Sequence, residues 1–154
     1  MIYKTGKLVL NQLDKKMEVF TQLKQLAVPA DGWIKTIRTA LNMSLRQLGE
    51  RMSITPQSLR SMETREKEGA VTLKTLRDAA AALDMQLYYC FIPNDGSLDA
   101  LIERKAYELA TEIVSRTSAS MRLEDQENTY QRRQQSIKEL AEEMKREMPK
   151  SLWD

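Results

Sequence analysis

Polar side chains that could read a nucleic acid gather in one short stretch, between Thr55 and Ser61. Gln57 and Ser61 carry an amide and a hydroxyl, which can hydrogen-bond to the edges of base pairs, and Arg60 can pair with a phosphate oxygen. A helix that lies in the major groove of DNA uses this combination of groups. The stretch therefore indicates DNA binding, provided that the surrounding elements present it on an exposed helix face.

Two short helices and a tight turn are predicted over Ser44–Glu63. Ser44 is a favourable N-cap, and Gln47 three residues later completes a capping box. Thr55 is a second N-cap, and Pro56 suits the first helical position because its missing N–H costs no hydrogen bond there. The predicted inward side chains recur at helical spacing, and Gly49 is expected to let a crossing helix approach closely. These inward positions are Leu45, Leu48, Met52, Leu59 and Met62.

This arrangement resembles the helix-turn-helix of phage-repressor-like (Xre-type) regulators. In that pattern Gln57 and Ser61 fall on base-reading positions, while Leu45 and Pro56 replace polar residues that members often have there. The positions that pack the motif are matched by Leu48, Gly49, Ile54, Leu59, Met62 and Glu63. An ordinary helical hairpin with a solvated outer face is the alternative interpretation.

The predicted DNA-binding surface extends beyond the second helix and carries positive charge. The whole chain of 154 residues has a net charge of only +2, but the stretch from Trp33 to Arg77 holds nine basic and four acidic residues. Such a local excess of positive charge favours contact with phosphates. The predicted contact residues are Arg46, Thr55, Gln57, Ser58, Arg60, Ser61, Arg65 and Lys67.

The elements around the motif are also predicted to be helical. A polar arm or frayed terminus over Met1–Lys7 is expected to precede an amphipathic helix over Leu8–Leu26. Asp31 is the expected N-cap of a helix whose core stripe contains Trp33, Ile34, Ile37 and Leu41. After a predicted loop over Thr64–Val71, Thr72 is expected to cap a closing helix.

Gln86–Ile92 reads QLYYCFI and predicts a single β-strand. A lone strand leaves its backbone groups unpaired, so its expected partner is a second copy of the chain, with Leu87, Tyr89 and Phe91 in the contact. Such a homodimer would place two recognition helices one DNA turn apart on a palindromic operator. The arrangement resembles the antitoxin of a persistence-kinase pair. A buried helix tail is the alternative.

The last third of the chain predicts two further helices. Ser97 caps the first, whose apolar stripe includes Leu98, Leu101, Ile102, Leu109 and Ile113, and Arg116–Ser120 is expected to loosen it. The second runs from Glu124 to about Glu147, with a stripe of Tyr130, Ile137, Leu140, Ala141 and Met144, and ends before Pro149. Both are polar except for one seam, which suits packing on the bundle, a twin subunit or another protein. The predicted fold class is mainly α: a repressor-like helix-turn-helix bundle with one short β-strand and long flanking helices, divided into residues 1–30, 31–93 and 94–154.

The whole chain resembles the mobile mystery protein A family. The matching stretches are GWIKTIRTALNMSLRQLGERM, TLKTLRDAAAALDMQLYYCFIP, RLEDQ and the final LWD. This resemblance implies an Xre-type regulator encoded beside a Fic-domain protein, and hence an antitoxin or an operon regulator. Thr64, Glu68 and Gly69 also match the inhibitory pattern of Fic regulators, which is either a real motif or chance, and SMRLED at Ser120–Asp125 is a near match.

Several classes of function have no support in the residues. The chain has no histidine and one cysteine, Cys90, which rules out His-based triads, His-ligated metals and cysteine-cluster zinc sites. No glycine-rich phosphate loop, secretory signal or membrane span is apparent. Cys90 lies in an apolar run and is expected to be buried. We therefore expect a cytoplasmic, non-enzymatic protein without a cofactor, whose partners are double-stranded DNA and a second copy of itself. The family resemblance implies a Fic-domain protein as a further partner. The remaining alternatives are an antitoxin that acts mainly by inhibiting its partner through the C-terminal helices, and a helical scaffold without affinity for DNA.

Overall fold

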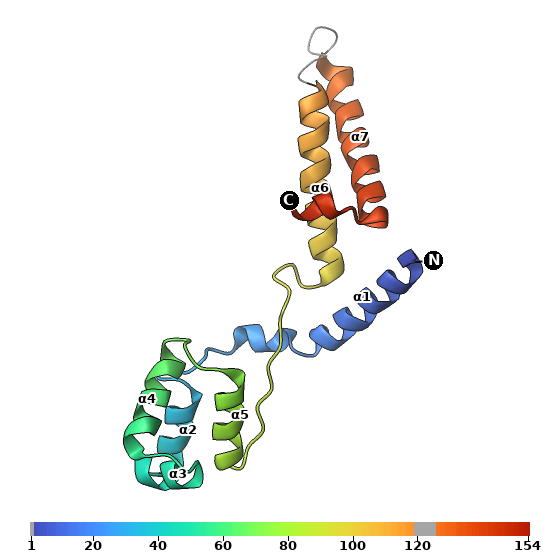
Figure 1. Ribbon diagram of the computed structural model, residues 1–154. Helices are drawn as coiled ribbons and strands as arrows, with labels where there is room; N and C mark the ends of the chain where they lie inside the picture. Colours follow the sequence, from blue (N-terminus) through green and yellow to red (C-terminus); the bar gives the residue numbers. More distant parts are fainter. Residues whose placement is uncertain (1, 119–125) are drawn as a thin grey trace. The chain divides into compact units, whose positions relative to one another are not determined.

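The computed structural model describes residues 2–118 and 126–154, which form seven α-helices and two short 3-10 helices (Figure 1). They divide into two compact units, Met1–Lys24 with Cys90–Asp154 (unit 1) and Gln25–Tyr89 (unit 2). The expected division into residues 1–30, 31–93 and 94–154 stays a prediction. The mainly helical fold class is confirmed, and Ser120–Asp125, with its SMRLED near match, lies outside the described residues.

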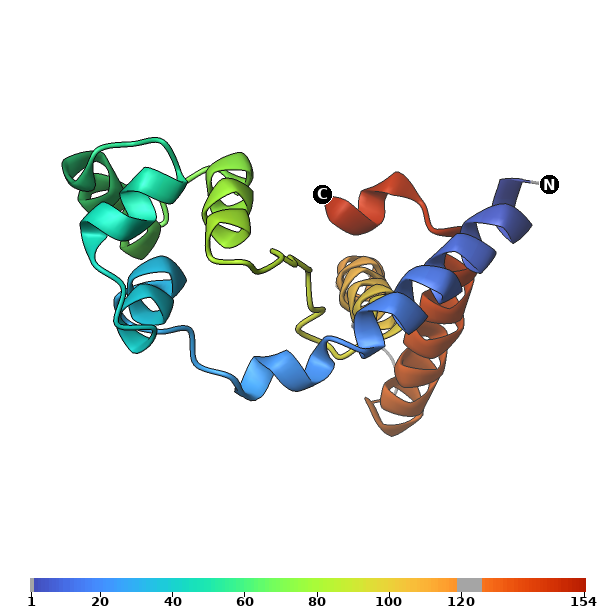
Figure 2. The ribbon, with the colours of Figure 1, turned by 90° about the horizontal axis from the view of Figure 1, so that it is seen from below.

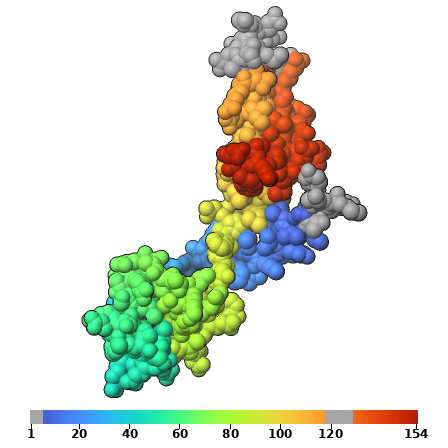
Figure 3. All heavy atoms as spheres, in the orientation of Figure 1, coloured from blue at the N-terminus to red at the C-terminus, as the bar shows by residue number. Residues whose placement is uncertain are grey.

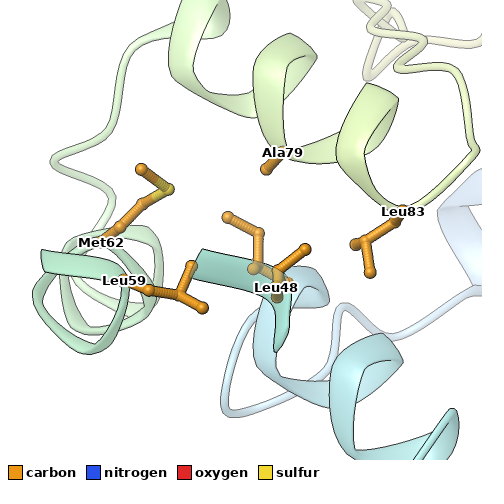
Figure 4. Close-up of a cluster of buried hydrophobic side chains, with 6 residues drawn as sticks. Leu48, Leu59, Met62, Ala79 and Leu83 are labelled. Carbon is orange, nitrogen blue, oxygen red and sulfur yellow. The ribbon is translucent and has the colours of Figure 1, made fainter. Parts of the chain in front are cut away.

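Unit 2 is a bundle of four short helices: α2 (Trp33–Ala40), α3 (Leu45–Arg51), α4 (Pro56–Lys67) and α5 (Leu73–Ala82). One side chain or more from each helix points into a shared apolar core, as the close-up in Figure 4 shows for most of them. Leu48 and Leu59 are completely buried there, at 0% exposure. The core consists of Ile34, Leu48, Leu59, Met62, Ala79 and Leu83.

The predicted caps of the two motif helices are confirmed. The backbone N–H of Gln47 donates to the Ser44 hydroxyl over 3.1 Å, and the N–H of Ser44 donates back to the Gln47 side chain over 2.8 Å. At α4 the N–H of Ser58 donates to the Thr55 hydroxyl over 3.1 Å, with Pro56 at the first helical position. Thr72 caps α5 in the same way. These caps satisfy N–H groups that a helix start otherwise leaves unpaired.

A buried ion pair joins α2 to α4. The Arg38 guanidinium donates to Glu63 through Nε over 2.6 Å and through Nη2 over 3.2 Å, and its Nη1 donates to the carbonyl of Met43 over 2.9 Å. Both side chains are about nine-tenths or more buried. Because removing one partner would leave an uncompensated buried charge, this pair fixes α4 relative to α2 and to the turn before α3.

The N-terminus of α2 is capped from another helix, so the prediction that Asp31 is its N-cap is wrong. The N-cap residue is Gly32, which has no capping side chain and a φ of 82°. The N–H groups of Trp33 and Ile34 instead donate to the two carboxylate oxygens of Glu66, over 2.8 and 2.9 Å. A Cβ on Gly32 would lie 2.8 Å from that carboxylate, so the close approach requires glycine.

Asp31 is instead an ion-pair partner of two lysines. Its carboxylate accepts from Lys67 and from Lys35, each over 3.1 Å, and these bonds, the one from Lys67 most of all, lower the pKa of Asp31. Together Glu66 and Asp31 hold the last turn of α4 against the start of α2.

The core stripe predicted for α2 is only partly correct. Ile34 is buried and Ile37 packs against the core, but Trp33 and Leu41 are 51% and 52% exposed. Trp33 is the first residue of a helix only eight residues long, and the position beside it, Ile34, takes the place facing α4. The prediction that Trp33 is a core anchor is therefore wrong.

The loop predicted from Thr64 begins later. Helix α4 continues to Lys67, Glu68 is its C-cap, and Gly69 has the positive φ of 73° that commonly ends a helix. The extra turn is stabilised because Glu63 and Glu66 both find partners in α2. Glycine at position 49 is needed by the turn of the motif itself, since a Cβ there would lie 2.8 Å from the carbonyl oxygen of Ile54.

Unit 1 contains α1 (Ile2–Glu18), α6 (Leu98–Ser118), α7 (Gln126–Glu147) and η2 (Lys150–Trp153), with η1 (Thr21–Gln25) following α1. Figures 1 and 2 show α6 and α7 side by side as a hairpin, with α1 and η2 against α6. The predicted arm over Met1–Lys7 is wrong from Ile2 onward, because these residues form the first turns of α1. The expected single helix over Leu8–Leu26 also stops at Glu18.

The core of unit 1 depends on small residues that the predicted stripes omitted. Ala106 and Ala110 have 0% exposure and lie one turn apart on α6, where they allow α7 to approach. Ile137 from α7 and Leu152 from η2 are also buried, whereas Tyr130, expected in the α7 stripe, is 66% exposed. In the space-filling view the side chains of α6 and α7 fill the space between the two helices (Figure 3).

The start of α6 is doubly capped. The Ser97 hydroxyl accepts from the N–H of Ala100 over 3.0 Å, as predicted, and the Asp14 carboxylate of α1 accepts from the N–H groups of Leu98 and Asp99 over 2.6 and 3.2 Å. The preceding turn is held by a two-point ion pair in which Arg104 donates to Asp95 over 2.8 and 3.0 Å. This pair lowers the pKa of Asp95.

The predicted β-strand over Gln86–Ile92 is not present. Residues 2–118 and 126–154 contain no β-strand. Residues 86–92 form no backbone hydrogen bond with any of these described residues. The residues have strand propensity, but a strand needs a neighbour to accept and donate backbone hydrogen bonds, and the part of the chain that the structure describes supplies none. Cys90 is half-buried here instead of buried.

Candidate nucleic-acid interface

Helix α4 turns one uncharged polar face outward. Successive residues on an α-helix are rotated by about 100°, so the direction opposite the buried Leu59 and Met62 is occupied by Gln57, Ser61 and Thr64. All three are exposed. The side chains of Gln57 and Ser61 make no hydrogen bond within the described residues, so their amide and hydroxyl groups are available to an external partner.

Two arginines flank this face. On the same helical projection Arg60 and Arg65 lie on either side of it, roughly 70° from its centre. Both are exposed, and neither guanidinium has an ion-pair partner in the part of the chain that the structure describes. The residues of α4 form part of the outer surface of unit 2 in Figure 3. A strip of hydrogen-bonding groups with positive charge on both sides suits a groove bordered by phosphates.

Thr64 is the one member of this face that the sequence prediction missed. The sequence predicts a loop from Thr64 onward, whereas Thr64 lies on α4 and its hydroxyl donates to the carbonyl of Arg60 over 3.1 Å. The signal that could have found it is the recurrence of Glu63 and Glu66 on the side of Leu59 and Met62, which continues the helical period beyond the motif.

Thr55 and Ser58 are partly engaged at the start of α4. The Thr55 hydroxyl donates to the Ser58 hydroxyl over 2.8 Å while it accepts the Ser58 N–H. Both side chains are exposed, so they line the N-terminal end of the polar face. A helix N-terminus carries partial positive charge and attracts phosphate. Thr55 and Ser58 are therefore better placed to contact a DNA phosphate than to read a base.

Arg46 and Lys67, the other predicted contacts, already face carboxylates. Lys67 is bonded to Asp31, which makes it the least available of the predicted DNA-binding set. The Nε atom of Arg46 lies 3.8 Å from Oε1 of Glu50, and both side chains are about two-thirds exposed or more. Exposed pairs of this kind contribute only about 0–1 kcal/mol, so a phosphate could replace Glu50 as the partner of Arg46.

The three predicted dimer contacts lie in the unpaired segment after α5. Tyr89 and Phe91 are 57% and 80% exposed, and Leu87 is half-buried. The Arg77 guanidinium stacks over the Tyr89 ring at 5.7 Å from its centroid, a cation–π contact. The single chain therefore leaves these aromatic side chains largely open to solvent.

The Fic-inhibitory pattern falls on the C-terminal end of the same helix. Thr64 belongs to the outward polar face, Glu68 is the exposed C-cap, and Gly69 lies just beyond it. A partner that bound all three residues would therefore cover part of the outward polar face of α4. No group of three or more metal-ligating His, Cys, Asp or Glu side chains occurs among residues 2–118 and 126–154. In the same ranges no helix has the length and apolar character needed to cross a lipid bilayer.

Comparison with family models matches residues 34–90 to the helix-turn-helix family HTH_3. The matched range begins in α2 and ends after α5, so it covers the four-helix bundle and the whole of the α4 face. Comparisons with curated proteins and with solved structures give no match.

Proposed function

From the helix-turn-helix domain at residues 34–90, we propose that the protein is a sequence-specific DNA-binding transcription regulator that inserts α4 into the major groove. The observation that carries this proposal is the outward face of α4. Gln57 and Ser61 are exposed and unbonded there, and Arg60 and Arg65 border them with free positive charge. In this role Gln57 and Ser61 read bases, and the two arginines contact phosphates.

The direct test measures fluorescence anisotropy on a duplex from the protein's own promoter and on a random duplex, at several salt concentrations. Gln57→Ala is expected to lose about 1–3 kcal/mol of preference for the promoter, because an amide contact to one base is removed. Arg65→Ala is expected to weaken binding to both duplexes alike and to reduce the salt dependence by about 0.9 in logarithmic slope.

The matched control is Gln131→Ala, which removes another exposed glutamine from a helix, α7. It should bind both duplexes as the wild type does. Equal affinity of the wild type for promoter and random DNA would contradict sequence-specific recognition. No salt dependence at all would contradict DNA binding of any kind.

The regulator is proposed to act as a homodimer on a palindromic operator. Support comes from residues 86–92, which form no backbone hydrogen bond among residues 2–118 and 126–154 and whose Tyr89 and Phe91 are exposed. Pairing of this segment with a second copy would satisfy its backbone groups and bring together two α4 helices at a fixed spacing. We further propose that the protein is cytoplasmic, that it is not an enzyme and that it uses no cofactor.

A second proposed function is the binding of a protein partner, a Fic-domain protein in an antitoxin pair, through the α6–α7 hairpin. The supporting observation is a surface hollow of about 370 Å³ between Tyr107 and Tyr130, which are 48% and 66% exposed and lie beside several glutamines. Tyrosine is enriched where protein partners bind most tightly. Exchange of both tyrosines for alanine should weaken capture of the neighbouring gene product while DNA binding is retained. If capture is unchanged, the α6–α7 hairpin does not bind this partner.

A further inference from the structure

An apolar groove of about 310 Å³ opens on unit 2 between α2, α5 and the residues that follow α5. Its lining includes Ile37, Leu76 and Leu83 from the helices, and the exposed side chains on its edge are Trp33, Met85 and Tyr88. Only one of its lining residues, Glu66, is charged, and both of its carboxylate oxygens are already bonded to α2. The groove is therefore an uncharged, aromatic-edged surface on the DNA-binding bundle.

The composition of this groove is that of a protein interface. Aromatic residues and methionine are enriched, and charged residues depleted, at the centre of surfaces where proteins associate. Trp33, Met85 and Tyr88 are 51%, 46% and 74% exposed, which is costly for side chains of this size unless another surface covers them.

The backbone beside the groove points to a polypeptide as the covering molecule. Gln86, Leu87 and Tyr88 line the groove, and their N–H groups donate to, and their carbonyl groups accept from, no other backbone group of the described residues. A small apolar molecule could fill the groove but could not pair with a row of backbone groups. Another extended peptide segment can do both, because a strand spaces its donors and acceptors to match.

The exposed aromatic area at the groove can be compared with the area that a stable interface between two protein chains buries. An aromatic side chain buries about 150–250 Å² when covered, so Trp33, Tyr88 and Tyr89, each half-exposed or more, offer on the order of 350 Å². A stable interface takes about 800 Å² from each partner. These three aromatic side chains would thus supply nearly half of that area.

We propose that the occupant is a second copy of this chain, whose own segment 86–92 lies along this one and covers the Trp33 groove. The inference rests on the proposed homodimeric regulator and assigns its interface to a specific surface. The contact is isologous: each copy offers the same groove and the same segment, so a two-fold axis closes it as a dimer without leaving an open end.

Trp33 makes the proposal directly measurable. The chain has two tryptophans, and Trp153→Phe leaves Trp33 as the only one. In that variant, mass from light scattering and Trp33 emission are followed together over a dilution series. At micromolar concentration the expected mass is that of two chains. On dilution the mass should fall to that of one chain, and the Trp33 emission should shift to the red over the same concentration range.

Tyr88→Asp is expected to weaken dimerisation at least tenfold by placing a charge at the edge of the groove. The matched control is Val19→Asp, which charges an equally exposed side chain (74%) just beyond the end of α1 and should leave the dimer unchanged. Circular dichroism of both variants checks that the helices remain folded. A dimer that survives Tyr88→Asp, or whose Trp33 emission does not change on dissociation, would overturn the assignment of the surface.

A mass of one chain at all concentrations would overturn the inference completely. In that case, a shift of Trp33 emission on addition of the amphiphilic dye anilinonaphthalene sulfonate would indicate that the groove binds a small ligand instead. Binding to a duplex that holds a single half-site separates the two proposals. A monomer that binds the half-site retains the DNA-binding function and refutes this interface, whereas a dimer that binds no duplex retains the interface and refutes the function.

Discussion

Removal of Glu63 should release α4 from the bundle that holds it. In the folded protein the Glu63 carboxylate accepts two hydrogen bonds from Arg38, and both side chains are about nine-tenths or more buried. Glu63→Ala leaves the guanidinium buried without a carboxylate. Breaking a buried pair from one side costs about 3–5 kcal/mol, because the remaining charge stays desolvated.

The two tryptophans allow this cost to be measured in one unit at a time. Trp33 belongs to unit 2 and Trp153 to unit 1, so Trp153→Phe gives a protein whose fluorescence reports unfolding of unit 2 alone. With a urea dependence near 1 kcal/mol per molar for a unit of this size, Glu63→Ala should lower the urea midpoint by about 3–5 M. Glu63→Gln, which keeps the shape of the side chain, should give a smaller loss.

Two further variants make the comparison specific. Glu68→Ala removes an exposed glutamate from the end of the same helix and should change the stability by no more than about 0.5 kcal/mol. The double variant Arg38→Met with Glu63→Leu removes both charges and should recover most of the loss, since an apolar pair of similar volume replaces a buried ion pair well. A Glu63→Ala protein as stable as the wild type, or a double variant no better than the single one, would refute the reasoning.

Two other predictions concern glycine and pH. Gly49→Ala should destabilise unit 2 by about 1–3 kcal/mol, because its Cβ would lie 2.8 Å from the carbonyl oxygen of Ile54, whereas Gly6→Ala meets no atom within 4 Å and should stabilise α1 by up to about 1 kcal/mol. Urea unfolding of each variant measures both, and equal effects would contradict the contact. Arg104 lowers the pKa of Asp95, so the stability from this pair is present above the unfolded carboxyl pKa of about 3.9 and is lost as the pH falls through the lower, folded value. Unfolding followed by Trp153 emission should therefore show that the pair stabilises unit 1 equally from pH 7 to 5. Below about pH 4 this stabilisation should be lost, and Asp95→Asn, which lacks the pair, should not show that loss. An equal loss of stability in acid for Asp95→Asn would contradict the assignment.

The part of the fold that the sequence predicts is the part decided by nearby residues. Ser44 with Gln47, Thr55 with Pro56, and Thr72 each hold a helix start through atoms no more than three residues apart, and each was found where predicted. The outward direction of Gln57 and Ser61, the proposed base-reading residues, follows from the same register, because burial of Leu59 and Met62 turns them outward.

The part that could not be predicted depends on partners distant in the chain. Glu66 caps α2 across 32 residues and Glu63 meets Arg38 across 25, so neither contact leaves a local pattern, and the length of α4 was underestimated as a result. The segment Gln86–Ile92 has the opposite difficulty. Its composition favours a strand, but strand structure requires a neighbouring backbone, and no described part of the chain supplies one.

Selection of bound sequences from a random duplex library tests the central claim most directly. If α4 reads bases, the wild type should enrich one short motif, and Gln57→Ala should lose the preference at a single base position of that motif while keeping the others. If the wild type enriches no motif, or if Gln57→Ala enriches the same motif with the same preference at every position, the exposed face of α4 does not read DNA.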